Sequence, residues 1–362
     1  MRFIINILKE EQTMNNNITS TTALIDETTQ GERRRSAYWF GNAEGIHHPF
    51  WVIVSKEISD QLRSWRFIIL VSIILLTCIG SMYTAVTNIG HSVKASDVST
   101  TFFFLKLFTV SDGTMPSFFV FISFLGPLLG ISLGFDAINS EYNRGTLSRV
   151  LAQPIHRDYL LNAKFVAALT VISVLFFALG FLVIGLGLIT IGIPPTAEEF
   201  WRMIAFLILS IFYVAFWLNL SILFSVRFKQ PATAALAGIA VWLFLTVFYP
   251  LIVNLIMKSL APAQMAMASP KQLFDLEELR LTLMRILPNQ LFSDATTTLL
   301  MPTVRSLGPL TMEQVYGTIP GPLPLGQSIL LVWPQVTGLI AATIVCFVLS
   351  YVSFMKKEIR SR

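Results

Sequence analysis

Charged residues are scarce in this sequence, and six long stretches contain none. The chain is 54% apolar and 13% charged, and the six stretches run over about 67–86, 117–135, 165–193, 203–226, 231–257 and 328–354. Each is close to the ~20 residues that a helix needs to cross a bilayer core. Backbone groups in lipid must pair within their own segment, and the alternating pattern of a transmembrane β-barrel is absent. The sequence therefore predicts an all-α integral membrane protein with six transmembrane helices.

The missing residue types also exclude several functions. With no Asp, Glu, Lys, Arg or His in these stretches, proton-coupled carriers, intramembrane proteases and haem sites lack their reacting groups. Neither the nucleotide-binding pattern G-x-x-x-x-G-K-[ST] nor the zinc pattern H-E-x-x-H occurs. The two cysteines, Cys78 and Cys346, lie in separate stretches, which favours buried small side chains over a disulfide or metal pair. We therefore expect no enzyme active site, no metal site and no cofactor bound by this chain.

The positions of lysine and arginine predict the orientation in the membrane. With the N-terminus inside, 18 of the 26 lysines and arginines fall on the inner side, in the segments before 67, at 136–164, at 227–230 and in the tail 355–362. Positive charge near helix ends favours the cytoplasmic side. Both termini are therefore expected to be cytoplasmic. The net charge of +5 follows from this bias, so it does not indicate nucleic-acid binding.

An amphipathic segment precedes the first stretch. Residues 1–48, rich in Asn, Thr and Ser, are expected to form a mobile cytoplasmic leader. Over 49–66, apolar residues recur at spacings of three and four and share one helical face: Trp51, Val54, Ile58, Leu62 and Trp65. Two tryptophans on this stripe favour an elbow helix lying in the membrane interface. A plain extension of the first span is the alternative.

The spans carry candidates for helix packing and for a cargo pathway. Gly126, Gly130 and Gly134 recur at every fourth position of the second span and allow another backbone to approach closely, within one subunit or between two. Aromatic and amide residues of the fourth and fifth spans are candidates for a wall that faces an amphiphilic cargo, or for core packing: Tyr213, Trp217, Asn219, Trp242, Phe248 and Tyr249.

The charged loop 136–164 is the strongest functional candidate. Gly145 is expected to end the helix that leaves the second span, and Thr146 to cap a short helix that stops at Pro154. Such a helix, held across the ends of two spans, is suited to receive a push from another protein. Transport requires the protein to switch between two states, and inverting such an equilibrium from 1:99 to 99:1 takes roughly 5.5 kcal/mol. The spans contain no ion relay that could supply this energy. A separate ATPase is the expected source, although an ordinary polar connector fits the same pattern.

The loop resembles the first cytoplasmic loop of ABC-2 type transporter permeases, of the kind associated with copper-site assembly and multidrug export. The matching residues are Glu141, Arg144, Gly145, Thr146, Leu147, Leu151, Pro154, Arg157 and Lys164, whereas Ala163 stands in place of the usual glycine. The resemblance implies that the residues from Glu141 to Arg157 couple the chain to a cytoplasmic ATP-binding subunit, which holds ATP and magnesium. It also implies a second permease subunit, identical or related, and the plasma membrane of a prokaryote.

The long segment 258–327 is expected to be an extracytoplasmic loop between the fifth and sixth spans. We expect a helix over Leu273 to Leu287, followed by Pro288-Asn289-Gln290-Leu291-Phe292, which also resembles the family. A loop of this length usually has its own structure or function. It leaves open a second function, a non-transporting membrane scaffold or sensor that binds a partner on the outer face.

Overall fold

The computed structural model describes residues 49–92, 102–110, 116–146, 157–192, 194–260, 270–304, 306–307 and 322–356. Close contacts divide the chain into two units, Met1–Val52 and Ile53–Arg362. Of the first unit only residues 49–52 are described, and they begin a helix. The predicted leader 1–48 and most of the tail 355–362 lie outside the described residues.

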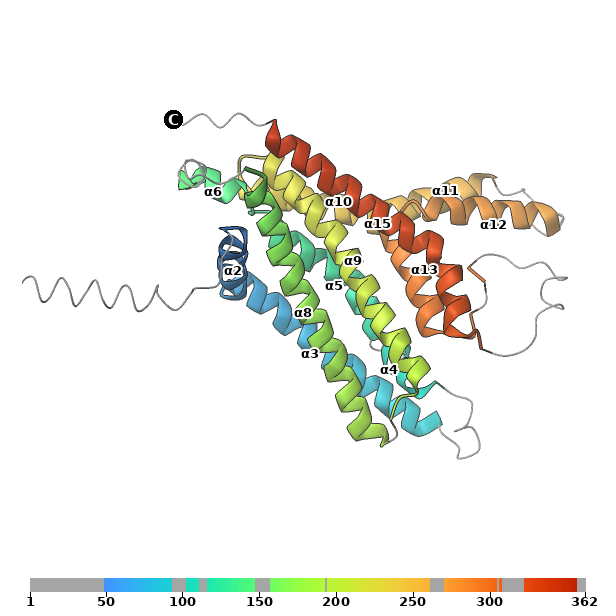
Figure 1. Cartoon of the computed structure of the whole chain (residues 1–362). Coiled ribbons are helices and arrows are strands. Elements are labelled where there is room, and N and C mark those ends of the chain that lie inside the picture. Colours follow the sequence, from blue (N-terminus) through green and yellow to red (C-terminus); the bar gives the residue numbers. More distant parts are fainter. Residues whose placement is uncertain are drawn as a thin grey trace, which may run out of the picture. The chain divides into compact units, whose positions relative to one another are not determined.

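The described residues form helices without any strand (Figure 1). The elements are α2 (Pro49–Leu62), α3 (Trp65–Ser92), α4 (Phe103–Thr109), α5 (Phe118–Gly134), α6 (Asn139–Asn143), α8 (Arg157–Ile191), α9 (Ala197–Arg227), α10 (Pro231–Leu243), the π-helix η1 (Phe244–Phe248), α11 (Tyr249–Leu260), α12 (Pro270–Met284), α13 (Pro288–Leu300) and α15 (Leu325–Met355). Six of these segments are long and apolar enough to cross a membrane, with α10, η1 and α11 together forming the fifth. The six predicted transmembrane helices are confirmed.

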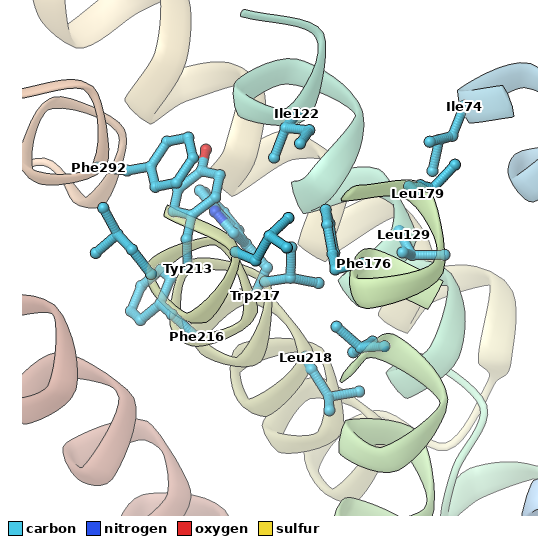
Figure 2. Close-up of a cluster of buried hydrophobic side chains, with 14 of the residues drawn as sticks. Ile74, Ile122, Leu129, Phe176, Leu179, Tyr213, Phe216, Trp217, Leu218 and Phe292 are labelled. Carbon is cyan, nitrogen blue, oxygen red and sulfur yellow. The ribbon is translucent and has the colours of Figure 1, made fainter. Parts of the chain in front are cut away.

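Helix α9, the fourth span, lies in the middle of the bundle. It packs against α5, α8, α13 and α15 (Figure 1). Figure 2 shows Tyr213, Trp217 and Leu218 of α9 among side chains of α5, α8 and α13. A helix that is apolar on all sides is typical of such a central position.

The glycine stripe of α5 brings its backbone against α9. A Cβ atom on Gly130 would lie 2.7 Å from the carbonyl oxygen of Val214, and one on Gly134 would lie 2.8 Å from that of Leu218. These neighbours are backbone atoms, so no side-chain rotation can make room. The structure thus places the stripe in packing within one subunit, one of the two alternatives that the sequence left open.

Helix ends account for the main departures from the predicted spans. Helix α8 begins at Arg157 and α9 at Ala197, so each starts six or more residues before the uncharged stretch it contains. Lys164 and Arg202 therefore belong to spanning helices and are both buried. The Arg202 guanidinium donates to the Glu198 carboxylate at 2.9 Å and to the Leu299 carbonyl at 3.0 Å. Charge is absent from the middle of the spans but not from their ends.

The long segment between the fifth and sixth spans folds largely into helices. Helix α12 forms a hairpin with α11, and α13 packs against α9 and α15 (Figure 1). The predicted helix 273–287 corresponds to α12, which lies three residues earlier at each end, and the Pro288–Phe292 motif begins α13. The Phe292 ring stacks on Tyr213 with centroids 4.3 Å apart, and the Asn289 amide contacts the Tyr213 hydroxyl. The Asn289 amide also donates to Thr246 of η1 at 3.0 Å.

Replacing Gly130 by leucine is expected to separate α5 from α9 and to destabilise the fold by at least about 1–3 kcal/mol, the usual cost of overpacking. The check is the thermal unfolding midpoint of the purified protein in detergent. Gly185→Ala on α8 is the matched control, because a Cβ atom there meets nothing within 4 Å. A Gly130→Leu protein as stable as this control would contradict the packing described.

Candidate functional site

Helix α6 is held against the end of α9. The backbone N–H groups of Ile138 and Asn139 donate to the Ser225 hydroxyl at 2.9 and 3.2 Å. One turn later, the Asn143 amide donates to the Lys229 carbonyl at 2.9 Å, in the turn between the fourth and fifth spans. Figure 1 shows α6 near the point where α9 ends and α10 begins. We call this region, with α2 and the start of α8, the α6 end of the bundle.

Gly145 ends a helix, as the sequence predicts, but that helix is the short α6, because α5, the helix that leaves the second span, already ends at Gly134. The Arg144 N–H still donates to the Ser140 carbonyl at 3.0 Å, and Gly145 then takes a φ of +66°. This left-handed conformation favours glycine, which has no Cβ atom to clash with the backbone. The Thr146 hydroxyl donates back to the Glu141 carbonyl of α6 at 3.2 Å, and Thr146 is itself helical after the turn at Arg144 and Gly145. The predicted following helix, with Leu147, Leu151 and Pro154, lies outside the described residues.

A buried ammonium joins three elements at the α6 end. The Lys164 Nζ atom of α8 lies 2.9 Å from Glu57 Oε2 of α2 and 2.8 Å from Glu141 Oε1 of α6. The three side chains are 6%, 11% and 16% exposed, respectively. Little water reaches these charges, so the Glu141 carboxylate depends on Lys164 for a counter-charge, and the Glu57 carboxylate depends on Lys164 together with Lys56 at 3.2 Å. We call these residues the Lys164 triad.

The triad changes the acidity of Glu57. Burial by itself raises the pKa of this carboxyl, because the charged form loses water. The Lys164 ammonium and, at 3.2 Å, the Lys56 ammonium outweigh that effect. The pKa of Glu57 therefore lies below its ordinary value, and the group is ionised at neutral pH.

A second charged contact joins α3 to the turn after α5. The Arg66 guanidinium lies 2.7 Å from the Asp136 carboxylate and 4.8 Å from the centre of the Phe135 ring. Arg66 is 54% exposed, so this pair is weaker than the buried triad. Together the contacts connect the ends of α2, α3, α5, α6, α8 and α9.

Comparison with known proteins gives the family. Residues 51–359 match the ABC-2 family transporter proteins. The chain belongs to the ABC-2 transporter family. Two relatives, each named a probable ABC transporter permease protein NosY, come from Stutzerimonas stutzeri and Pseudomonas aeruginosa. Each is 27% identical, over 205 and 208 residues, which is 55% and 56% of this chain and 67% and 68% of the relatives. The predicted family is confirmed, and the chain is a multi-pass ABC transporter permease.

In this ABC-2 permease the elbow segment is two helices instead of one. The chain turns at Arg63–Ser64, where the Ser64 hydroxyl accepts the Phe67 N–H at 3.2 Å, so Trp65 begins α3. Only Val54 of the predicted stripe is fully buried, and Ile58 is half-buried. Trp51, Leu62 and Trp65 are exposed, and Glu57 is buried instead. The side of α2 that meets the protein is thus rotated from the predicted stripe toward Glu57.

Sequence reasoning placed Glu141, Arg144, Gly145 and Thr146 together, and the structure brings them to the end of α6. Arg157 begins α8, and Arg144 is exposed. Sequence reasoning missed Glu57 and gave Lys164 no partner. The only signal for Lys164 was its place in the family motif, and nothing in the sequence marked Glu57, which lies 107 residues away.

The predicted cargo wall does not form one surface. Tyr213, Trp217 and Asn219 are buried inside the subunit, with at most 1% exposed, whereas Phe248 is 50% exposed. The first three residues therefore belong to core packing, as the alternative held. Phe248 of the predicted wall and Phe124, which the prediction did not include, are both 50% exposed, and the Phe124 ring is edge-on to Trp242 at 4.9 Å.

Replacing Glu57 by glutamine is expected to lower the thermal unfolding midpoint at pH 7 and to flatten its acid dependence. A carboxyl with a lowered folded-state pKa stabilises above its unfolded value, here 4.5, and this stability is lost as pH falls further through the folded-state pKa. The measurement compares midpoints from pH 7 to pH 3.5. Parallel curves for the two proteins would show that Glu57 contributes no pH-dependent stability.

Proposed function

We propose that this chain is the permease subunit of an ATP-driven ABC transporter, and that the segment from Glu141 to Arg157 receives a separate ATP-binding subunit. The connected ends of six helices at the α6 end carry this proposal. A push on α6 is transmitted to α9 through Ser225 and to α8 through Lys164. ATP and magnesium bind the partner in this proposal, and no cofactor binds this chain.

The α6 end faces the cytoplasm in this proposal. Exposed basic side chains gather there, including Lys56, Arg144 and Lys229, in keeping with the bias of positive charge toward the inside. Helix α2 then lies at the inner membrane surface, with Trp51, Leu62 and Trp65 toward the lipid headgroups. Both termini are cytoplasmic in this proposal, because the number of spans is even.

A second permease subunit, identical or related, covers the exposed side of the fifth span. That span is the least buried of the six, and its apolar side chains are exposed along its whole length, from Leu236 through Phe244 to Leu255. A pathway between two such subunits, lined by Phe124 and Phe248, suits an amphiphilic cargo. The push on α6 tilts the first, second and fifth spans, and this movement opens the pathway alternately to the inner and the outer side of the membrane.

The scaffold alternative is less well supported. It requires the segment 258–327 to be available to an outer partner, but α13 of that segment packs into the bundle against α9 and α15. The part of this segment that forms α13 therefore serves the fold of the permease itself.

Arg144→Glu is expected to reduce recovery of the ATP-binding subunit with tagged permease about tenfold or more, because like charge on a docking surface opposes association. Permeases with Gly145→Leu or Glu141→Ala should still bind the ATP-binding subunit, but ATP hydrolysis by that subunit should no longer drive transport. Co-purification in mild detergent and an ATPase assay measure both effects. The control is Lys271→Glu, an exposed charge reversal on α12. Equal recovery with Arg144→Glu and the control would count against docking at this segment.

Single cysteines are expected to report opposite sides of the membrane. In a protein with Cys78 and Cys346 replaced by alanine, Glu278→Cys on α12 should react with an impermeant maleimide added to intact cells. Ser55→Cys on α2 should react only after the membrane is opened. Both positions are exposed, so access to the reagent and not burial decides the result. The reverse labelling pattern would place the α6 end outside.

A further inference from the structure

The elbow helix α2 is held by a few apolar side chains, among them the buried Val54, and by the Lys164 triad. No described helix makes an extended contact with α2 from Ile53 onward. Ile53 and Ile58 pack against the main core, and the Glu57 carboxylate forms an ion pair with Lys164 at 2.9 Å. Lys164 is therefore the point at which α2 meets both α8 and α6.

We infer that Lys164 is a positioning residue that couples the elbow helix α2 to α6, so that the two move as one body. The inference rests on the proposed function, since it identifies how motion of the coupling segment reaches the elbow. In this inference, Glu57 is the residue of α2 through which the motion of α6 is passed to the elbow helix. Neither residue needs to touch the ATP-binding subunit.

The chemistry of the triad is suited to connecting α2 with α6. An ammonium has three donors, so a single Lys164 can serve Glu57 Oε2 and Glu141 Oε1 at once. Without the ammonium, two carboxylates would face each other in a buried site and repel. Lys56 also lies 3.2 Å from Glu57 but belongs to α2 itself, so Lys164 is the charge that joins α2 to α6. Burial also protects the contacts from screening by salt, unlike the exposed Lys56–Asp60 pair.

The contact between α2 and Lys164 can be removed without leaving an unpaired charge. Glu57→Leu removes the α2 carboxylate and leaves Lys164 paired with Glu141, so the remaining pair is neutral overall. Glu57→Gln makes the same cut with an isosteric side chain, for the case in which leucine prevents folding. Asp60→Asn is the matched control, because it neutralises an exposed carboxylate on the same helix. Lys164→Arg keeps the charge and should retain the coupling.

The experiment measures a distance and a rate in the complex of permease and ATP-binding subunit. Spin labels at Ser55→Cys on α2 and Asn143→Cys on α6, in the protein without Cys78 and Cys346, report how the two helices move. The Asn143 label removes the bond to Lys229 in every protein compared, so differences among these proteins still report the effect of Glu57. The parent protein and Asp60→Asn should give one narrow distance distribution that is the same with ATP and with ADP. Glu57→Leu and Glu57→Gln should give a broad distribution that differs between the nucleotides.

The second measurement is the rate of ATP hydrolysis by the ATP-binding subunit, with and without the permease, and the quantity compared is the difference between the two rates. The Glu57 variants should reduce this difference about 2- to 30-fold, the range found for residues that carry coupling. Recovery of the partner should stay the same, which a general loss of folding would not allow. Narrow, nucleotide-independent distances in both Glu57 variants would overturn the inference. If the parent permease binds no ATP-binding subunit, the proposed function fails, and the distances in the permease alone still decide whether Lys164 joins α2 to α6.

Discussion

The close contact of α5 with α9 determines where the rest of the α6 end can lie. Because Gly130 and Gly134 have no side chains, the two backbones meet almost directly, and α5 ends beside the last turns of α9. The chain then turns into α6 at a point where Ser225 can cap it. Any wider spacing would separate α6 from Ser225 and Lys229, and α6 would lose its support.

Charge is placed where the membrane tolerates it. The middle of each span is apolar, while Lys164 and Arg202 lie near helix ends, buried and paired. Arg202 connects α9 to the segment before the sixth span, and Lys164 connects α8 to α2 and α6. The bundle is thus held by buried cations near the two ends of its helices, with apolar packing between them. This arrangement is compatible with the proposed transmission of a push from the α6 end through a bundle whose middle is apolar.

The fifth span differs from the other five. It is little buried, contains the π-helix η1, and is attached to α13 through Asn289 and to α12 through Tyr249, whose hydroxyl donates to the Leu283 carbonyl at 3.1 Å. π-Helices are rare and frequently occur at functional sites. A span with few contacts can move with respect to α9 at low cost, which fits the role proposed for it at the interface between subunits.

The sequence by itself determined the six spans and a helix end at Gly145. An uncharged stretch of about 20 residues in lipid has one stable backbone conformation, and a helix end that needs a positive φ favours glycine. These are local properties. The tertiary structure decided that Glu57 faces inward, that Tyr213 and Trp217 are core residues, and that Lys164 serves two carboxylates. Which helical faces meet depends on contacts between distant residues, and no local period in the sequence records them.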